Sequence, residues 1–278
     1  MKKILLFGNC QVGALSAIMA PILVDYTLEV LSCWITNISK EDFTKKINEI
    51  DVIITQPIND NYREKDYLNT NYIIKNVKLD TKVIIFPSLH FNFYYFDYSY
   101  KIYKNKLVQK PSDYHYYSLI EKYENKEDYT VFINNCIINK DFKSPEYLID
   151  LANKSIDAII ARETKMNEEY SNCNFISVAS FIRDNYRKKL LFYSINHPTK
   201  HLLEYITNQI FKILEIDFDN NYNNIDPLYY NDRGILYRCI QNVVEFDITM
   251  HKPKLNNIEN INDICSNYYD TYDTIFDN

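Results

Sequence analysis

Glycine is scarce in this chain: its 278 residues include 3 Gly, whereas 26 are Tyr and 15 are Phe. Because Gly is the usual residue where the backbone turns tightly or another group approaches it closely, each of the three is informative. Hydrophobic residues make up 46% and charged residues 24%, and these values exclude an intrinsically disordered chain. The length predicts one or two domains with a sizeable buried core.

The chain also has no net positive charge. The formal net charge is -6 at pH 7 and the pI is about 5.5. A protein that binds nucleic acid needs a basic surface to neutralise phosphates. We therefore predict that nucleic acid is not a partner.

The chain lacks closely spaced cysteines and long apolar runs. None of its six cysteines forms a Cys-x-x-Cys pair, which argues against a zinc site or a small disulfide scaffold and indicates a reduced, cytoplasmic protein. The apolar run at residues 4–7 is shorter than the ~7–15 residues of a signal peptide core. No apolar stretch approaches the ~18–20 residues of a membrane span, so we predict no transmembrane segment.

The first ninety residues alternate short apolar runs with helical patterns. The apolar runs predict four strands, at 3–7, 28–35, 51–55 and 82–86. The stretches between them predict three helices, at 11–20, 39–50 and 62–76. Ser39 is placed to cap the second of these, with Asp42 three residues later. Strands that alternate with helices predict an α/β fold with a parallel sheet flanked by helices.

The second half is mainly helical. Its patterns predict helices at 112–123, 145–154, 156–170, 177–188 and about 198–214, and a further strand at 190–193. We predict an α/β core at residues 1–215 with a helical insertion at about 110–188. Residues 216–278 would form a C-terminal extension packed on this core.

Polar side chains follow the predicted strands where those strands end. In an open parallel sheet, ligands bind at the carboxyl ends of the strands, so these side chains are expected to meet at one rim. We predict that six of them bind substrate or stabilise an oxyanion: Asn9, Gln11, Gln56, Ser88, His90 and Asn196.

Cys10 is the candidate nucleophile. It follows the first strand and begins the next helix, where the helix dipole favours thiolate over thiol and lowers a cysteine pKa. Gly8 permits the tight turn before it. The alternative is that Cys10 is a small buried apolar residue, as free cysteines often are.

His197 is the candidate base. It precedes Pro198, which we place at the first position of the last predicted helix, so the imidazole is free to point over the rim. The alternative is a capping or packed histidine. His201 lies four residues later, but no third ligand is evident, and we predict no metal site.

Four motifs in order resemble those of the WcbI-like polysaccharide biosynthesis proteins, which act in making bacterial capsules. The motifs are Gly8–Gln11, Thr55–Pro57, Phe86–Phe91 and Asn196–Thr199, and the resemblance covers about residues 1–215. It implies an SGNH-like variant of the α/β fold, binding of coenzyme A and O-acetyl transfer to a capsule sugar.

The resemblance also assigns roles to residues of this chain. Cys10 takes the place of the SGNH serine, and His197 with Pro198 resembles the last motif of that superfamily. Ser194 stands where the usual acid lies, so a Cys–His dyad is expected in place of a triad. We assign Gly8, Arg63 and His201 to cofactor binding.

Together these observations predict a CoA-dependent acetyltransferase that uses a small acyl donor and a sugar or glycan acceptor. Either Cys10 takes the acetyl group with His197 as its base, or His197 activates the sugar hydroxyl and Cys10 only lines the site. Two alternatives remain open: an SGNH-type esterase with water as acceptor, and a non-catalytic module that binds CoA, a nucleotide or a glycan. A homo-oligomer is compatible with each reading.

Overall fold

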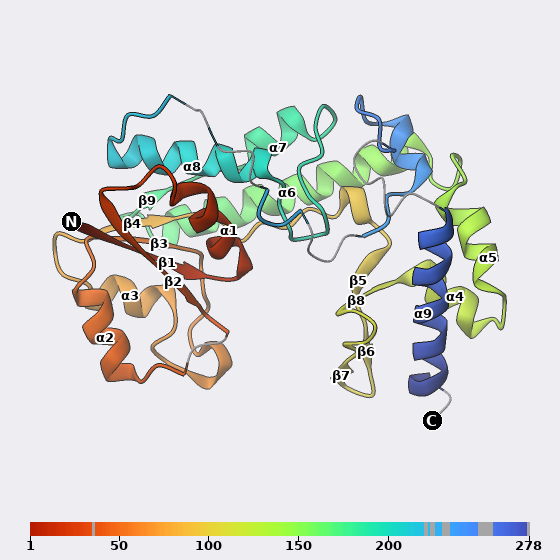
Figure 1. The fold of residues 1–278 in the computed structure, drawn as a ribbon, viewed down its shortest axis with the longest axis horizontal. Helices are drawn as coiled ribbons and strands as arrows, with labels where there is room; N and C mark the ends of the chain where they lie inside the picture. The colour runs from red at the N-terminus through yellow and green to blue at the C-terminus, as the bar shows by residue number, and fades with distance from the viewer. Residues whose placement is uncertain (35–36, 220–221, 223–225, 230–233, 250–257, 277–278) are drawn as a thin grey trace. The chain divides into compact units, whose positions relative to one another are not determined.

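A five-stranded parallel sheet organises the first part of the chain (Figure 1). The structure is a computed structural model that describes residues 1–34, 37–219, 222, 226–229, 234–249 and 258–276. In sheet order the strands are β2 (Tyr26–Ser32), β1 (Lys2–Gly8), β3 (Val52–Thr55), β4 (Lys82–Ile85) and β9 (Asn174–Phe175). All neighbouring pairs are parallel, which confirms the predicted α/β class. The SGNH-like detail stays a prediction, because several doubly wound folds share this strand order.

Helices cover both faces of this sheet (Figure 1). Leu5 of β1, Ile53 of β3 and Val83 of β4 are register partners and share one face. Helices α2 (Lys40–Asn48) and α3 (Thr70–Asn76) pack there through residues such as Phe43 and Ile73. Helices α1 (Cys10–Met19) and α8 (Lys200–Leu214) contact each other on the opposite side. This two-sided burial explains why the strands are apolar runs without alternation.

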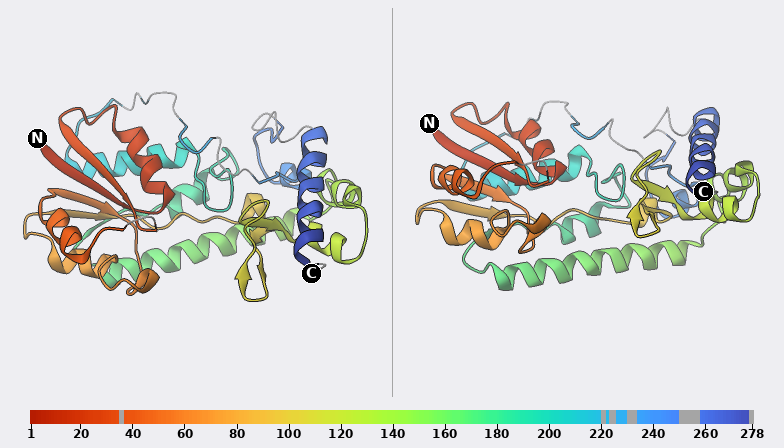
Figure 2. Two further views of the ribbon diagram at one scale, coloured as in Figure 1. Left: turned by 60° about the horizontal axis from the view of Figure 1, so that its bottom comes forward. Right: turned by 90° about the horizontal axis from the view of Figure 1, so that it is seen from below.

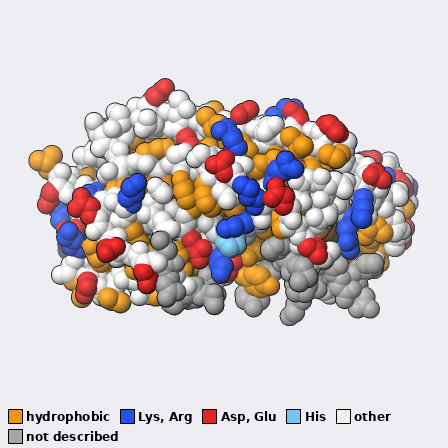
Figure 3. All heavy atoms as spheres, turned by 90° about the horizontal axis from the view of Figure 1, so that it is seen from above, with side chains coloured by type: hydrophobic (Ala, Val, Ile, Leu, Met, Phe, Trp, Pro, Cys, Tyr) orange, Lys and Arg blue, Asp and Glu red, His pale blue; other side chains and the backbone are white. Residues whose placement is uncertain are grey.

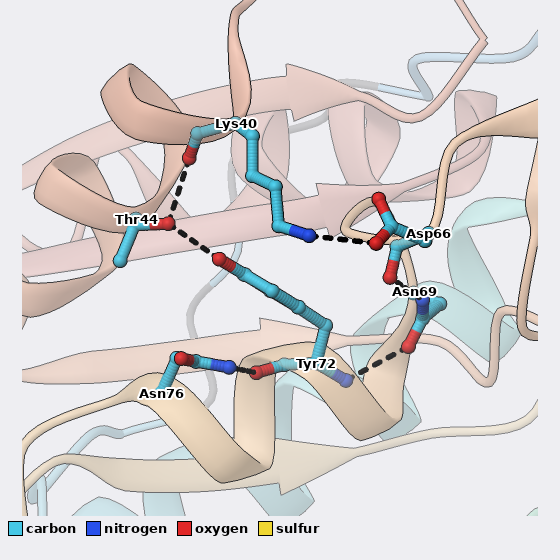
Figure 4. Close-up of polar contacts among 6 residues, drawn as sticks. All are labelled: Lys40, Thr44, Asp66, Asn69, Tyr72 and Asn76. Carbon is cyan, nitrogen blue, oxygen red and sulfur yellow. Dashed lines mark hydrogen bonds and ion pairs between the residues drawn. The ribbon is translucent and has the colours of Figure 1, made fainter.

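Polar contacts join α2 to the start of α3 (Figure 4). Lys40 Nζ lies 2.6 Å from a carboxylate oxygen of Asp66, and the hydroxyls of Thr44 and Tyr72 are 2.6 Å apart. The Asn69 side chain accepts a hydrogen bond from the backbone N–H of Tyr72 at 2.8 Å and so caps α3. These contacts fix the end of the loop that joins β3 to α3.

Several predicted elements differ from the structure. The helix expected at 62–76 is a single 3-10 turn at Tyr62–Glu64 followed by α3, because Asn61, Arg63 and Glu64 have left-handed backbones. The fifth strand is β9, whereas residues 190–193 form no ladder of the five-stranded sheet. Pro198 is not the first helical residue, since Thr199 is the N-cap of α8.

The helices expected at 145–154 and 156–170 form one continuous helix, α6 (Pro145–Glu169), which both views of Figure 2 show unbroken. Ser144 precedes Pro145 at its start, as predicted, and its hydroxyl accepts from the backbone N–H of Tyr147. The chain between the two predicted helices contains no Gly or Pro, so nothing there interrupts the backbone hydrogen bonds.

The internal contacts divide the chain into two compact units. Unit 1 consists of Met1–Leu89, Asp157–Ile182 and Pro198–Tyr229, and unit 2 consists of His90–Ile156, Arg183–His197 and Tyr230–Asn278. Unit 1 holds the sheet. Helices α6 and α7 (Ala179–Asn185) each begin in one unit and end in the other.

Unit 2 is built from short elements and aromatic side chains. Its strands are β5 (Tyr98–Tyr100), β6 (Ile102–Tyr103), β7 (Lys106–Leu107) and β8 (Tyr114–Tyr116), which form two antiparallel pairs. Its helices include α4 (Tyr117–Glu124), α5 (Tyr129–Phe132), a π-helical turn at Ile133–Ile137 and α9 (Ile258–Phe276), with 3-10 turns at Phe93–Tyr95 and Arg238–Asn242. Buried rings such as Phe91 and Tyr94 are core residues here.

Helix α9 packs firmly within unit 2. The Tyr268 hydroxyl donates to the Tyr114 carbonyl at 2.6 Å, and the Tyr272 hydroxyl lies 3.0 Å from Nδ1 of the buried His115. The C-terminal segment is thus part of a hydrophobic core. Among the described residues, none of the helices combines the length and the apolar character that crossing a bilayer requires.

Candidate functional site

The turn between β1 and α1 presents Cys10. Asn9 is the N-cap of α1, and its side-chain oxygen accepts from the backbone N–H of Gln11 at 2.9 Å. Cys10 is therefore the first residue of the helix, one residue before the start predicted from the sequence, and it is partly exposed. No described residue accepts a hydrogen bond from the Nδ2 group of Asn9, so this donor remains available to a ligand.

Two buried amides, which we call the Gln11–Gln56 clamp, hold this turn against the neighbouring strand ends. The Oε1 atom of Gln56 accepts from the backbone N–H of Asn9 at 2.9 Å, and its Nε2 donates to Oε1 of Gln11 at 2.6 Å. Gln11 in turn donates to the carbonyl of Leu89 at 2.9 Å and accepts from its N–H at 3.1 Å. The clamp joins the loops that follow β1, β3 and β4.

The clamp gives both glutamines a positioning role in the structure. Gln11 is 0% exposed and Gln56 is 1% exposed, and each carbonyl oxygen is engaged by backbone or side-chain donors. Buried amides that satisfy several backbone groups stabilise one loop arrangement. Direct contact of either glutamine with an oxyanion stays a prediction.

Gly8 makes the clamp possible. A Cβ atom at this position would lie 2.6 Å from Oε1 of Gln56 and 2.8 Å from Cγ1 of Val12. Any side chain would displace the amide that holds Asn9. In the structure Gly8 therefore supports the turn.

Burial raises the pKa of the Cys10 thiol above its ordinary value of 9.0. The backbone N–H groups of Cys10 and Gln11 lower it, because they favour the thiolate at the helix start, and the nearby Cys33 raises it. The prediction of a lowered pKa is wrong in direction, since loss of hydration outweighs the helix start. Cys10 is a thiol at neutral pH and needs a base to react.

Cys33 lies beside the Cys10 turn, and Arg63 lies near Cys33. The backbone N–H of Cys33 donates to the carbonyl of Gly8 at 2.9 Å, directly after β2. Arg63 donates to the Trp34 carbonyl at 2.8 Å, and its charge is among the influences that lower the pKa of Cys33, although burial raises that pKa overall. Sequence reasoning missed Cys33, although it follows β2 just as Cys10 follows β1.

His90, Asn196 and His197 belong to unit 2. The backbone N–H of Phe91 donates to the Ile195 carbonyl at 2.8 Å, which brings the segments of His90 and Asn196 together. A tight turn follows, in which the N–H of Tyr193 donates to the His197 carbonyl at 2.7 Å.

Ser194, in the place of the missing acid, is fully buried and donates to the side-chain oxygen of Asn196 at 3.2 Å. This contact orients the Asn196 amide. The catalytic role of His197 and the substrate contacts of His90 and Asn196 stay predictions.

Ser88 lines a pocket in unit 1 of about 340 Å³ at the carboxyl ends of β3 and β4. Pro57, Ile58 and Asp60 come from the loop after β3, and Arg162 and Lys165 come from α6. Sequence reasoning missed Lys165, because α6 begins 60 residues after the end of β4 and its charges look like an ordinary helix surface. His201 lies in the first turn of α8, and its role in cofactor binding stays a prediction.

On the face drawn in Figure 3, Lys and Arg side chains stand among Asp and Glu side chains. Among the described residues, no group of three or more His, Cys, Asp or Glu side chains could hold a metal ion.

Comparison with known proteins gives a family and a fold. A family model described as polysaccharide biosynthesis enzyme WcbI matches residues 3–218. A solved structure described as WcbI, a novel polysaccharide biosynthesis enzyme, has a TM-score of 0.73 at 18% identity and covers 98% of this chain and 95% of its own. Its description specifies the native protein without a disulfide bond between coenzyme A and a cysteine. No curated protein matches the sequence.

Proposed function

The chain belongs to the WcbI family of polysaccharide biosynthesis enzymes, and on this premise we propose that it is an O-acetyltransferase. It would move an acetyl group from acetyl-CoA to a sugar hydroxyl of a capsular or surface polysaccharide. The observation that carries the proposal is the Cys10 turn, where a partly exposed thiol starts a helix and a clamp fixes it among three strand ends. The description of the related solved structure names coenzyme A together with a cysteine, and this supports a donor site beside Cys10.

The residues around the turn suit a CoA donor. CoA carries phosphate groups, and the exposed Arg63 guanidinium beside Cys33 can bind them. Gly8 allows the turn that carries the thiol to form, and His201 at the start of α8 is a further candidate contact. We therefore assign Gly8, Arg63 and His201 to the donor. A CoA donor also favours the cytoplasmic location predicted above.

In the covalent mechanism, His197 takes the proton of the Cys10 thiol and the sulfur attacks the acetyl carbon. The bond from that carbon to the CoA sulfur breaks, and the departing thiolate takes the proton from His197. The sugar hydroxyl then gives its proton to His197 and attacks the acetyl-Cys10 thioester. The sulfur of Cys10 leaves and regains the proton.

In the direct mechanism, His197 takes the proton of the sugar hydroxyl, and the sugar oxygen attacks acetyl-CoA. The CoA thiolate leaves with that proton, and Cys10 only lines the site. The Nδ2 group of Asn9 and the backbone N–H at the start of α1 would stabilise the oxyanion in both mechanisms. Asn196 and His90 would position the acceptor.

Donor binding is tested by calorimetric titration of the full chain with CoA and acetyl-CoA. We expect binding of both, about tenfold weaker for Arg63→Gln, because a phosphate would lose a charge-assisted hydrogen bond. Lys45→Gln, an exposed change on the outer surface of α2, serves as the matched control. If wild-type protein binds neither compound, the acetyltransferase proposal is refuted.

The mechanism is tested by mixing the protein with acetyl-CoA, quenching in acid and measuring peptide masses. An acetyl increment on the Cys10 peptide, absent in Cys10→Ala and retained in Cys33→Ala, would establish the covalent mechanism. An active Cys10→Ala variant without the increment would establish direct transfer. Acetate released at full rate without any sugar would instead identify an esterase, and binding without turnover would identify a non-catalytic module.

A further inference from the structure

The pocket beside Ser88 has a chemistry that the acetyl donor does not explain. We propose that this pocket, which we call the acceptor pocket, binds a sugar that carries an anionic group, either a carboxylate or a phosphate ester. Naming this sugar as the acetyl acceptor rests on the proposed function. All the lining residues belong to unit 1.

One face of α6 forms a wall of the acceptor pocket. Arg162, Lys165, Met166 and Glu169 are spaced as i, i+3, i+4 and i+7, which places them on the same side of the helix. The buried Glu163 anchors this part of α6, because its carboxylate accepts from the backbone N–H of Val178 at 2.6 Å. The wall therefore has a fixed orientation.

The first end of this wall is cationic. Arg162 and Lys165 are exposed to the pocket and form no hydrogen bond or salt bridge with another described residue. A guanidinium and an ammonium one helical turn apart bind a carboxylate or phosphate through charge-assisted hydrogen bonds. This end predicts the anionic group of the ligand.

The other end offers acceptors and donors for hydroxyl groups. Asp60 is held by the Asn71 amide, with contacts of 3.2 Å and 3.3 Å to its two carboxylate oxygens. Burial, together with the Glu169 and Asp60 charges, raises the pKa of Tyr170 to about 12, so its hydroxyl is a donor at neutral pH. Carboxylates, an amide and a phenol together match the mixed hydrogen bonding of a sugar ring.

Apolar groups and size complete the match. Pro57, Ile58 and Pro87 line the pocket and can contact the C–H groups of a ring. A volume of about 340 Å³ lies at the lower end of the ~300–1,000 Å³ range of ligand pockets, which suits one or two sugar units. A ligand of phosphates alone would meet the carboxylates of Asp60 and Glu169 unfavourably, so the ligand must carry hydroxyls as well.

One residue connects the acceptor pocket with the Cys10 turn. The Gln56 carbonyl accepts from the Thr70 hydroxyl at 3.0 Å, and this hydroxyl accepts from the backbone N–H of Ile58, a pocket residue, at 2.9 Å. The side chain of Gln56 holds Asn9 in the clamp. The pocket wall and the nucleophile turn are thus set by the same short segment after β3.

Binding is tested by saturation-transfer NMR on the full chain without acetyl-CoA, with glucuronate, glucose 1-phosphate and glucose as probes. We expect at least one anionic sugar to bind about tenfold more tightly than glucose. Preference for glucuronate would identify a carboxylate ligand, and preference for glucose 1-phosphate would identify a phosphate ester. Equal affinity for all three sugars would overturn the assignment of the cationic end.

Variants locate the site. Arg162→Gln and Lys165→Gln should each weaken binding of the preferred anionic sugar about tenfold. Glu169→Gln should weaken the binding of all three sugars. Lys154→Gln and Glu168→Gln, exposed changes on α6 outside the pocket lining, serve as matched controls and should leave affinities within about twofold. Unchanged affinity in all three pocket variants would overturn the inference.

CoA titration of the same variants separates the two proposals. If Lys165→Gln weakens the binding of CoA and leaves the affinity for the sugars unchanged, the pocket belongs to the donor. The inference is then wrong, while the acetyltransferase proposal stands. If wild-type protein binds an anionic sugar through Arg162 and Lys165 but never binds CoA, the pocket stands and the acetyltransferase proposal is wrong. Absence of binding to every sugar probe overturns the inference alone.

Discussion

At the scale of single residues, the Gln11–Gln56 clamp determines the position of the Cys10 turn. Its amides satisfy backbone groups of three loops that have no regular hydrogen-bond ladder of their own. A buried polar group that loses its partner costs about 1–3 kcal/mol, so each member of such a cluster depends on the others. The clamp is therefore a stability element and a positioning element together.

Gln56→Ala should lower the free energy of unfolding by about 2–4 kcal/mol, because it leaves the N–H of Asn9 without its partner, removes one of the two donors to Gln11 Oε1 and opens a small cavity. Urea denaturation measures the effect. Gln209→Ala, on α8 and only partly buried, should change it by about 0.5 kcal/mol or less. Equal values for the two variants would contradict the clamp.

Substitutions at Gly8 and Gly13 form a matched pair with opposite expected effects on stability. Gly8→Ala should destabilise the protein by about 1–3 kcal/mol, because its Cβ would meet the Gln56 amide. Gly13→Ala should stabilise it by about 0.5–1 kcal/mol, since its Cβ would meet nothing within 4 Å and Ala favours the helix. Thermal unfolding of both variants measures the contrast, and effects of the same sign would refute it.

Cys10 should react with iodoacetamide mainly at high pH. Burial raises its pKa, so the midpoint of thiolate formation in the folded chain lies above pH 9.0, the ordinary value for the thiol. Peptide mass spectrometry of samples labelled over a pH series gives the midpoint. In urea the midpoint should fall toward the ordinary value, and a folded midpoint below 9.0 would show an activated thiolate instead.

At the scale of elements, the N-cap of α3 shapes the acceptor pocket, because it ends the loop that carries Ile58 and Asp60. Asn69→Ala should lower the free energy of unfolding by about 1–2 kcal/mol through loss of the hydrogen bond from the Tyr72 N–H. Asn48→Ala, near the exposed end of α2, is the control and should change it by less than about 0.5 kcal/mol. Chemical denaturation compares the two variants.

Elements with strong local signals were predictable from the sequence. The apolar runs gave β1, β3 and β4, and the Ser39 cap of α2 accepts from the N–H of Asp42 as expected. Strand β9 was not predictable, because its two residues carry no periodic pattern. Residues 190–193 are as apolar as a strand, yet they are buried in unit 2 by rings such as Phe91. Only tertiary packing decides whether such an apolar segment joins the sheet or is buried elsewhere.

The candidate site was predictable only where it follows strand ends. Cys10, Gln11 and Gln56 lie directly after β1 and β3, and the order of a parallel sheet brings such positions together. Lys165 reaches the pocket because α6 packs on β4 through Met166 and Tyr170. That packing depends on a long connection through unit 2, which no local pattern encodes.

At the scale of the whole molecule, the stability of unit 2 should depend on pH through His115. Burial lowers its pKa below the ordinary 6.5, so between these two values the unfolded chain binds a proton that the folded chain does not. The free energy of unfolding therefore falls as the pH drops below about 6.5, by at most about 1.4 kcal/mol per pH unit.

This dependence is measured by urea denaturation at about pH 7.5 and about pH 5.5, followed by near-ultraviolet circular dichroism of the tyrosines. His115→Gln should reduce the difference between the two pH values, whereas fluorescence of Trp34, the single tryptophan and a unit 1 residue, reports the other unit. An unchanged difference in the variant would assign the pH dependence to other groups.

The position of the clamp along the chain has a consequence for synthesis. Gln11, Gln56 and Leu89 all lie within the first ninety residues, so they leave the ribosome before α6 and α8 have been translated. Strands β1, β3 and β4 can therefore pair on the nascent chain. The hydrogen bonds of the Gln11 and Gln56 side chains can form at the same time, because all their partners are already outside the exit tunnel. The later helices would then be added to a Cys10 turn that is already formed.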